Sequence, residues 1–312
     1  MQSVSNSVGI DIAKDRLDLG FGQEKVKTFS NDFKGVNALI QALPENAEVH
    51  YEPSGGYERL LVQALQERGI PAFAHNPRRV RRMADAMGIS AKTDALDAKV
   101  LAQLKGLGKP TRPKSAKKTQ ICDLSRTIQS LKNDRTRNLK RLKTPELAKQ
   151  VQLALKEVIA ALEKQIQVLE NAFVQSLEQT QHKEDYRRAQ TVPSIGKQTA
   201  RALVSELPED YQRMSGPQVS SYTGVAPFDD SSGKRNGPRH IRHGNTHLKS
   251  AMYMAAISCI RFQPWAKQLY TRLRAQGKPH EVAIVAVMRR LLLRVFAVLK
   301  RGSDWETEPP KR

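Results

Sequence analysis

Four acidic residues in the first third of the 312-residue chain stand where they could bind divalent cations: Asp11, Glu52, Asp94 and Asp97. The first two follow apolar runs, VGI and VHY, where a core residue is expected and where a charge is costly unless it is paired or metal-bound. The other two are three residues apart, so they share one face of a predicted helix. Carboxylate oxygens bind Mg²⁺, and two such ions can stabilise the attacking and leaving oxygens of phosphoryl transfer. For each acid alone, an ordinary surface position is the alternative.

The pattern around these acids predicts an α/β domain over residues 1–108. Three short β runs are expected at 7–13, 15–22 and 26–31, followed by a helix around Phe33–Leu43 and a strand at 47–52. After a Gly-containing turn come a helix around Tyr57–Arg68, a short strand at 71–76 and a helical region that reaches residue 106. Three β runs followed by alternating helices and strands is the order of a ribonuclease-H-like α/β domain.

Residues 109–188 are expected to form a basic helical hairpin. A Pro-bearing linker at 109–113 precedes a long helical pattern over 114–181, which only Thr144-Pro145 clearly interrupts. This predicts two long antiparallel helices packed like a coiled coil. The first arm has few acids for i,i+4 pairing, so a nucleic-acid contact competes with a merely solvated face. The candidate contacts in this arm are Lys117, Lys118, Arg135, Arg137, Lys140 and Arg141.

The overall charge favours a polyanionic partner. Lys and Arg number 52 against 31 Asp and Glu, a net charge of +21, and neutralised phosphates release counterions on binding. Two isolated cysteines argue against a disulfide framework and fit a reducing cytoplasm. We see no signal peptide, and Arg289, Arg290 and Arg294 interrupt the most apolar stretch. We therefore expect a cytoplasmic, nucleoid-associated protein with no membrane partner.

Residues 189–312 are expected to be mainly helical and to carry two phosphate-binding elements. The segment VPSIGKQTARALVSEL is similar to a helix-hairpin-helix, in which Gly196 and Lys197 would approach a phosphate at a helix N-terminus. Residues 220–256 then form a polar, Gly-rich loop whose guanidinium groups suit a phosphate backbone. Its candidate contacts are Lys234, Arg235, Arg239 and Arg242, and its histidines are interpreted as phosphate contacts or solvated residues rather than zinc ligands.

Several motifs resemble one known family. GIDIAK, YEPSGGYE and KTDALDAKVLA, in this order and spacing, are similar to the DEDD RuvC-like domain of the insertion-sequence-110 family of transposases, which includes pilin-gene-inverting invertases. The resemblance covers nearly the whole chain and implies that the four acids form the family's metal-binding set. One departure is the Pro-Ser-Gly-Gly turn after Glu52, where relatives often have Ala-Thr-Gly-Thr. The acid itself stays in place.

The same resemblance extends to a serine near the C-terminus. GVAPFDDSSG through GNTHLKSAMYMAA is similar to the family's transposase domain, which implies that Ser232 is a nucleophile, with Ser231 one residue away in the alignment. From the residues alone, Ser-Ser-Gly predicts a turn. The preceding Asp229 and Asp230 could either repel phosphate or add to a metal shell.

The resemblance implies a transposase or site-specific recombinase that cuts and rejoins double-stranded DNA, both target and donor. It further implies a structured non-coding guide RNA of the bridge type and a homodimer or homotetramer. One alternative is a RuvC-like Holliday-junction endonuclease, which would leave no covalent adduct and no purpose for residues 220–256. The other is a non-catalytic nucleic-acid chaperone that uses only its basic surfaces.

Overall fold

The computed structural model describes residues 6–21, 26–89, 94–106, 115–178, 180–232 and 235–306, with the backbone alone at 94–97, 230–232, 235, 236 and 238. The chain divides into two compact units, Met1–Pro113 and Lys114–Arg312. Each unit has its own hydrophobic core. They are described separately below.

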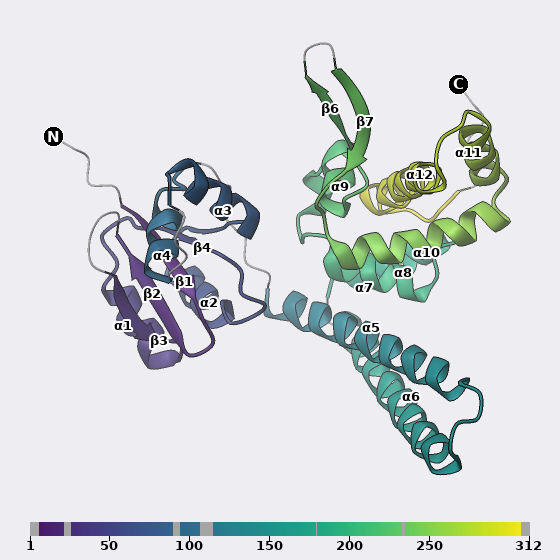
Figure 1. The fold of residues 1–312 in the computed structure, drawn as a ribbon, viewed down its shortest axis with the longest axis horizontal. Coiled ribbons are helices and arrows are strands. Elements are labelled where there is room, and N and C mark those ends of the chain that lie inside the picture. The colour runs from purple at the N-terminus through teal and green to yellow at the C-terminus, as the bar shows by residue number, and fades with distance from the viewer. Residues whose placement is uncertain are drawn as a thin grey trace. The chain divides into compact units, whose positions relative to one another are not determined.

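Alternating apolar residues build a five-stranded sheet in the first unit (Figure 1). The strand order is β3-β2-β1-β4-β5, with β1, β2 and β3 antiparallel and β1, β4 and β5 parallel. The strands are β1 (Ser7–Ile12), β2 (Arg16–Gly20), β3 (Lys27–Ser30), β4 (Glu48–Tyr51) and β5 (Ala72–Ala74). All five lie within the predicted β runs, which confirms the mixed α/β prediction for this part of the chain.

Helices cover both faces of this sheet. On one face, Ile10 and Leu19 pack with α1 (Phe33–Gln41) and α2 (Arg59–Glu67) in a single buried cluster. On the other face lies α4 (Asp94–Ala102), which packs with α3 (Pro77–Ala86). A Cβ atom at Gly9 of β1 would overlap the carbonyl oxygen of Ala98, so only glycine lets α4 approach so closely.

Two long helices open the second unit and pack along each other, α5 (Ala116–Leu142) and α6 (Lys149–Glu178). Ser115 caps α5 by accepting a hydrogen bond from the Lys118 amide. The buried residues of the pair recur at helical spacing and continue onto α8. They are Ile121, Ile128, Ile166, Phe173, Leu177 and Val204.

The remaining helices surround a second core. It is formed mainly by buried residues of α8, α10 and α12. The elements are α7 (His182–Thr191), α8 (Lys197–Glu206), η1 (Tyr211–Arg213), α9 (Gly216–Thr223), α10 (Thr246–Phe262), α11 (Pro264–Ala275) and α12 (His280–Arg301). Among the described residues, no helix combines the length and apolar character needed to cross a membrane.

The segment expected to be a loop contains a β-hairpin instead. Strands β6 (Pro227–Ser232) and β7 (Arg235–Ile241) pair in antiparallel register with one irregularity between Phe228 and Asp230. Figure 1 shows this hairpin extending from the helices of its own unit. The expectation of a loop over 220–256 was wrong because polar, Gly-rich residues predict strand poorly.

Candidate active site and phosphate-binding elements

Strand register brings Asp11 and Glu52 together. Strands β1 and β4 are parallel, and their pairing runs through Ile10 opposite Tyr51, so Asp11 and Glu52 are the next pair at the carboxyl ends. Neighbouring strands lie about 4.8 Å apart. Both acids are half-buried and both make other contacts within the chain. The two carboxylates thus share one sheet edge, on the face that α4 covers.

The direction in which α4 packs on β1 indicates where Asp94 and Asp97 lie relative to Asp11. The Ser7 hydroxyl donates to the Ala102 carbonyl at 2.6 Å, and Gly9 lies under Ala98, so α4 runs antiparallel to β1. Asp11 is two residues beyond Gly9 on β1. Because α4 runs the opposite way, the same direction from Ala98 leads back by about one helical turn to the first turn of α4. That first turn carries Asp94 and Asp97, whose side chains lie outside the described part.

No metal-binding group is complete among the side chains that the structure describes. Within them, no three His, Cys, Asp or Glu residues lie close enough to hold an ion. The side chains of Asp94 and Asp97 lie outside that part of the chain. The candidate metal centre therefore rests on the register of β1 with β4 and on the packing of α4 against β1.

A fifth acid, Asp18, was missed from the sequence. It pairs with Asp11 across β1 and β2 and is 6% exposed. Its carboxylate accepts a hydrogen bond from Thr28 Oγ1 at 2.6 Å and lies 3.2 Å from Arg16 Nε. Like charges directly opposite each other are destabilising, and Arg16 offsets this. In RLDLG, Leu17 and Leu19 alternate with Asp18. Because the two leucines belong to the core on one face of the sheet, this alternation could have placed Asp18 on the other face, with Asp11.

A buried histidine pair lies next to these acids and was also missed. His50 is fully buried, stacks on Phe73, and its Nδ1 lies 2.8 Å from His75 Nε2. Desolvation, with smaller effects from His75 and Lys105, lowers the pKa of His50 to about 4. Desolvation likewise lowers the pKa of His75. Both imidazoles are therefore neutral at neutral pH, joined by one N–H···N hydrogen bond.

The His50 environment predicts a pH-dependent stability. At His50 the unfolded state binds a proton near pH 6.5 and the folded state only near pH 4. The free energy of unfolding is therefore highest above pH 6.5 and decreases as the pH falls toward 4. The loss reaches at most about 3 kcal/mol. Urea unfolding across this range should show a shallower pH slope for His50→Phe than for the native chain. Equal slopes for His50→Phe and the native chain would contradict the prediction.

In the second unit, a short turn joins α7 to α8 in the segment whose sequence is similar to a helix-hairpin-helix. Ser194 adopts a left-handed conformation with φ 73°, and Gly196 is the N-cap residue of α8. A Cβ at Gly196 would meet nothing within 4 Å. Both Gly196 and Lys197 are exposed, so the α8 N-terminus is accessible to an anion.

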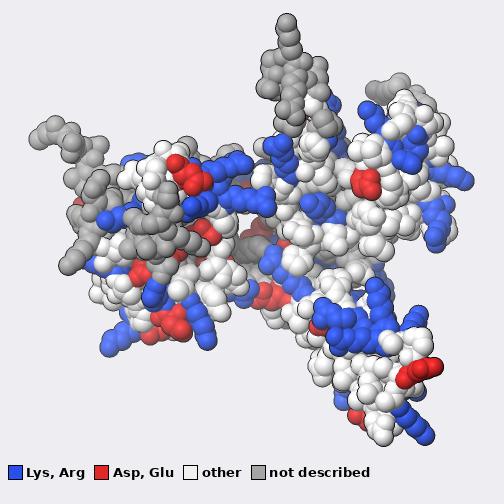
Figure 2. Space-filling view, viewed as in Figure 1, with Lys and Arg blue, Asp and Glu red and all other residues white. Residues whose placement is uncertain are grey.

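Exposure of the predicted basic contacts on α5 varies. Lys117, Lys140 and Arg141 are exposed, and Figure 2 shows Lys and Arg gathered over the α5–α6 hairpin. Arg135 lies 3.6 Å from Glu163 of α6, and Arg137 lies 3.2 Å from Asp134. Glu163 of α6 thus supplies one of the pairings that the α5 sequence lacks, and such exposed ion pairs contribute little to stability.

The prediction that Lys118 contacts nucleic acid was wrong. Its side chain is 1% exposed, and its Nζ donates to the carbonyl oxygen of Val204 in α8. The first turn of α5 packs against α8, so this lysine lies inside the unit. Its spacing to Ile121 and Cys122, both buried, was the signal that could have identified it.

The β6–β7 hairpin carries the predicted nucleophile and three of the predicted basic contacts. Ser232 ends β6, with Arg235 as its register partner; their side chains, and Gly233 and Lys234 entirely, lie outside the described part. The exposed Arg239 Nε lies 2.5 Å from Asp229 Oδ1, so Asp229 neutralises a neighbouring cation. Arg242 is exposed and has contacts of its own.

Two glycines and a buried glutamate fix the base of this hairpin. Gly224 (φ 79°) and Gly244 (φ 89°) cross so closely that a Cβ on either would overlap backbone of the other segment. Glu206 is 2% exposed, accepts two hydrogen bonds from Arg126 at 2.7 and 2.8 Å, and accepts one from Asn245 Nδ2 at 2.6 Å. The hairpin is therefore anchored to α5, α8 and α10.

Replacing Glu206 with Gln should lower the free energy of unfolding by about 3 kcal/mol. An amide has one acceptor oxygen instead of two, so its NH₂ group would face a donor from Arg126 or Asn245. Urea denaturation measures the change. The matched control is Glu163→Gln, an exposed partner of Arg135, which should cost less than about 1 kcal/mol. Equal losses for the two variants would contradict this assignment of Glu206.

Comparisons with known proteins agree with these features. A model of a DEDD-type transposase domain, described as "Transposase", matches residues 8–145, and one described as "Transposase IS116/IS110/IS902 family" matches residues 186–271. The "Pilin gene-inverting protein" of Moraxella lacunata is 27% identical over 96% of this chain and 97% of its own length; that of Moraxella bovis is 28% identical over the same shares.

A third relative matches only in part. The "Insertion element IS110 uncharacterized 43.6 kDa protein" of Streptomyces coelicolor is 32% identical over 121 residues, 38% of this chain. The matched segment spans 30% of that protein's length. The first family model contains all four predicted metal ligands, and the second contains Ser232 and the hairpin that carries it. This chain belongs to the IS110 family of transposases.

Proposed function

We propose that this protein cuts and rejoins DNA strands through a serine nucleophile on β6 and a carboxylate-bound Mg²⁺ site at the edge of the N-terminal sheet. The observation that supports the proposal is the parallel pairing of β1 with β4 up to Ile10 and Tyr51, directly before Asp11 and Glu52, with α4 packed on β1. The pilin gene-inverting relatives are named for a DNA rearrangement and match along nearly their whole length. This supports a recombination reaction over simple hydrolysis.

The donor set fits Mg²⁺. Carboxylate oxygens are the ligands that this hard cation prefers. Four carboxylates are available: Asp11 and Glu52 at the carboxyl ends of β1 and β4, and Asp94 and Asp97 in the first turn of α4. Asp18 lies opposite Asp11 but is already bonded to Thr28 and Arg16, so it serves as a neighbour rather than a ligand. When bound, the metal would supply Lewis-acid stabilisation of negative charge on the scissile phosphate.

The proposed reaction of the serine needs no oxidant, reductant or further co-reactant. Ser232 Oγ forms a bond to phosphorus, the bond from phosphorus to the leaving strand breaks, and that oxygen departs as a hydroxyl with the proton that the serine loses. The phosphoserine ester keeps the bond energy, so a hydroxyl from another strand can reverse the step and complete rejoining.

The proposal includes two partners beyond duplex DNA. Two strands must be cut and exchanged, so a homodimer or homotetramer brings paired sites together, and a serine of one subunit can act with the acids of another. A structured non-coding RNA, by resemblance to the family, selects target and donor. Exposed cations of α5, among them Lys140 and Arg141, are suited to its backbone. Sequencing the nucleic acid that copurifies with the protein tests this partner.

Removing the metal tests the reaction as a whole. The full-length protein, with its copurified nucleic acid, is incubated with DNA that flanks its own gene. We expect an SDS-resistant protein–DNA adduct with MgCl₂, no adduct with EDTA, and recovery when Mg²⁺ is added in excess over EDTA. Gel mobility after protease digestion distinguishes a covalent adduct from tight binding. Equal adduct yields with and without EDTA would reject the metal-dependent reaction.

A further inference from the structure

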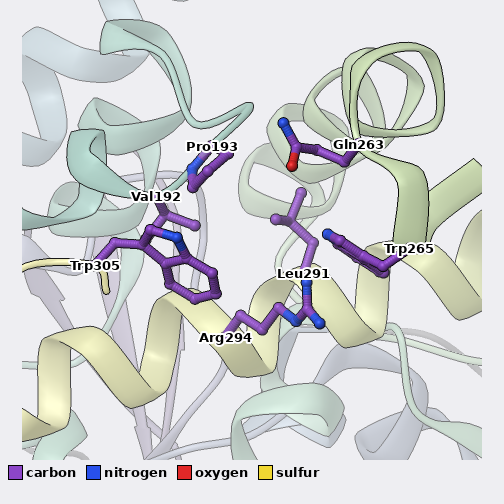
Figure 3. A pocket seen from close by; sticks show the side chains of 7 residues that line it. All are labelled: Val192, Pro193, Gln263, Trp265, Leu291, Arg294 and Trp305. Atoms are coloured by element: carbon purple, nitrogen blue, oxygen red, sulfur yellow. The ribbon is translucent and has the colours of Figure 1, made fainter. Parts of the chain in front are cut away.

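A pocket in the second unit, away from the hairpin, contains the chain's only two tryptophans. Its cavity measures about 200 Å³, larger than an engineered cavity of about 150 Å³ that takes up benzene. Figure 3 shows Trp265 and Trp305 on opposite sides with Arg294 between them. The lining residues are Val192, Pro193, Gln263, Trp265, Leu291, Arg294 and Trp305.

The guanidinium of Arg294 lies over the Trp265 ring and near the Trp305 ring. Its Cζ lies 3.9 Å from the Trp265 ring centroid and 5.8 Å from that of Trp305. A second cation, Arg290, lies 5.4 Å from the Trp265 ring. Planar, weakly hydrated guanidinium groups and indoles are the surfaces on which unpaired bases stack.

Two hydrogen-bonding groups at this pocket have no partner among the described residues. Trp305 Nε1 is buried without an acceptor, and a buried orphan donor is costly. The Gln263 side-chain amide, in the lining, makes no hydrogen bond to any described residue. An N–H donor and an amide, which donates and accepts, match the edge of a nucleobase.

The wall that carries Trp305 is held in place. Helix α12 ends at Gly302 in a left-handed conformation, and the chain turns back toward α7. Arg187 then donates two hydrogen bonds to Asp304 at 2.8 and 2.6 Å, and the Trp305 amide donates to Thr191 Oγ1 at 2.8 Å. The pocket is thus a built feature and not a frayed end.

The charge around the pocket favours a phosphate-bearing ligand. Residues 246–301 contain a single acid, Glu281, against eleven Lys and Arg. Arg261, Lys267 and Arg290, on the three helices beside the cavity, are exposed. A proline-rich peptide could also stack on indoles, but it has no need of this excess of cations.

We propose that this pocket binds one unpaired base of a single-stranded nucleic-acid segment, stacked on the Arg294 guanidinium that the Trp265 ring supports, with its edge toward Gln263 and Trp305 Nε1. A paired duplex cannot present a free base face, so the pocket selects strands that are unpaired or have a base turned out. This binding needs no metal and no strand cleavage. It stands or falls independently of the function proposed above.

Intrinsic tryptophan fluorescence reports directly on this pocket because it holds both tryptophans. Full-length protein carrying Asp11→Asn, in EDTA, is titrated with a short oligothymidylate and with an abasic strand of equal length. We expect the oligothymidylate to quench the fluorescence and the abasic strand to bind more weakly without quenching. A blunt duplex of the same length should not quench either.

Variants assign the effect to particular groups. Trp265→Ala, followed by fluorescence anisotropy of a labelled strand, should weaken oligothymidylate binding by about 5- to 150-fold and abasic binding little. Trp265→Phe should restore most of the affinity. Gln263→Ala, which leaves the aromatic walls intact, should weaken binding to a lesser extent, and the matched control Tyr253→Ala, an exposed aromatic on α10, should change nothing.

Two outcomes would overturn the proposal. One is that the protein with an unchanged pocket binds the base-containing and abasic strands with equal affinity. This comparison does not depend on whether any pocket variant folds. The other is quenching by a proline-rich peptide without quenching by oligothymidylate, which would identify a protein ligand instead. Loss of adduct formation in other assays has no bearing on either result.

Discussion

Replacing Asp11 with Asn is expected to lower DNA strand joining by roughly 100- to 1,000-fold while the N-terminal unit stays folded. Asn has nearly the same size and shape, so the pairing of β1 with β2 and β4 is kept. It lacks the negative charge that a metal-bound carboxylate supplies. Removing that charge also relieves repulsion from Asp18 across the strands, which is worth about 0.2–1 kcal/mol.

Thermal unfolding with and without MgCl₂ gives a second readout of the same change. At an ion concentration about 100 times Kd, binding stabilises the native chain by about 2.7 kcal/mol, and Asp11→Asn should lose most of that gain. The matched control is Asp15→Asn, an equal charge change at an exposed position between β1 and β2. It should keep both the activity and the Mg²⁺ effect. Full activity of Asp11→Asn, or an unchanged Mg²⁺ effect, would contradict the metal-ligand role.

The N-terminal domain could be predicted closely because its signals are local. Short β runs indicated all five strands, and Asp11 and Glu52 stood out because each follows such a run. Parallel strands end at one edge, so two acids at strand ends must meet there. The predicted roles of Asp94 and Asp97 came from the family resemblance, since the residues alone gave only a shared helix face.

The features that were missed depend on partners far apart in the chain. Glu206 is buried only because Arg126, 80 residues earlier, and Asn245 bond to it. His50 depends in the same way on His75, 25 residues later. A sequence pattern shows where a polar residue falls on an element, but the partner that makes its burial tolerable comes from tertiary packing.

The β6–β7 hairpin and Lys118 show two further limits of pattern reading. The strands of the hairpin are polar, and their alignment depends on the contact between Gly224 and Gly244, which strand propensity does not report. Lys118 belongs to a run of basic residues, and a charge run usually indicates a solvated face. Its helical spacing to Ile121 and Cys122 is the stronger signal.

Replacing Ser232 with Ala is expected to abolish the covalent protein–DNA adduct and strand joining, because no other atom at that position can form the ester. DNA binding should persist, since the cations of α5 and α8 are untouched. The adduct is measured as an SDS-resistant band with labelled DNA. In the native chain the modified serine can be located by mass spectrometry in the tryptic peptide Met214–Lys234, which contains both candidate serines.

The neighbouring serine provides the matched control. Ser231→Ala removes the neighbouring hydroxyl and leaves that of Ser232 in place, so this variant should keep the adduct. An adduct that survives in Ser232→Ala, or that maps to Ser231 in the native chain, would show that Ser232 is not the nucleophile.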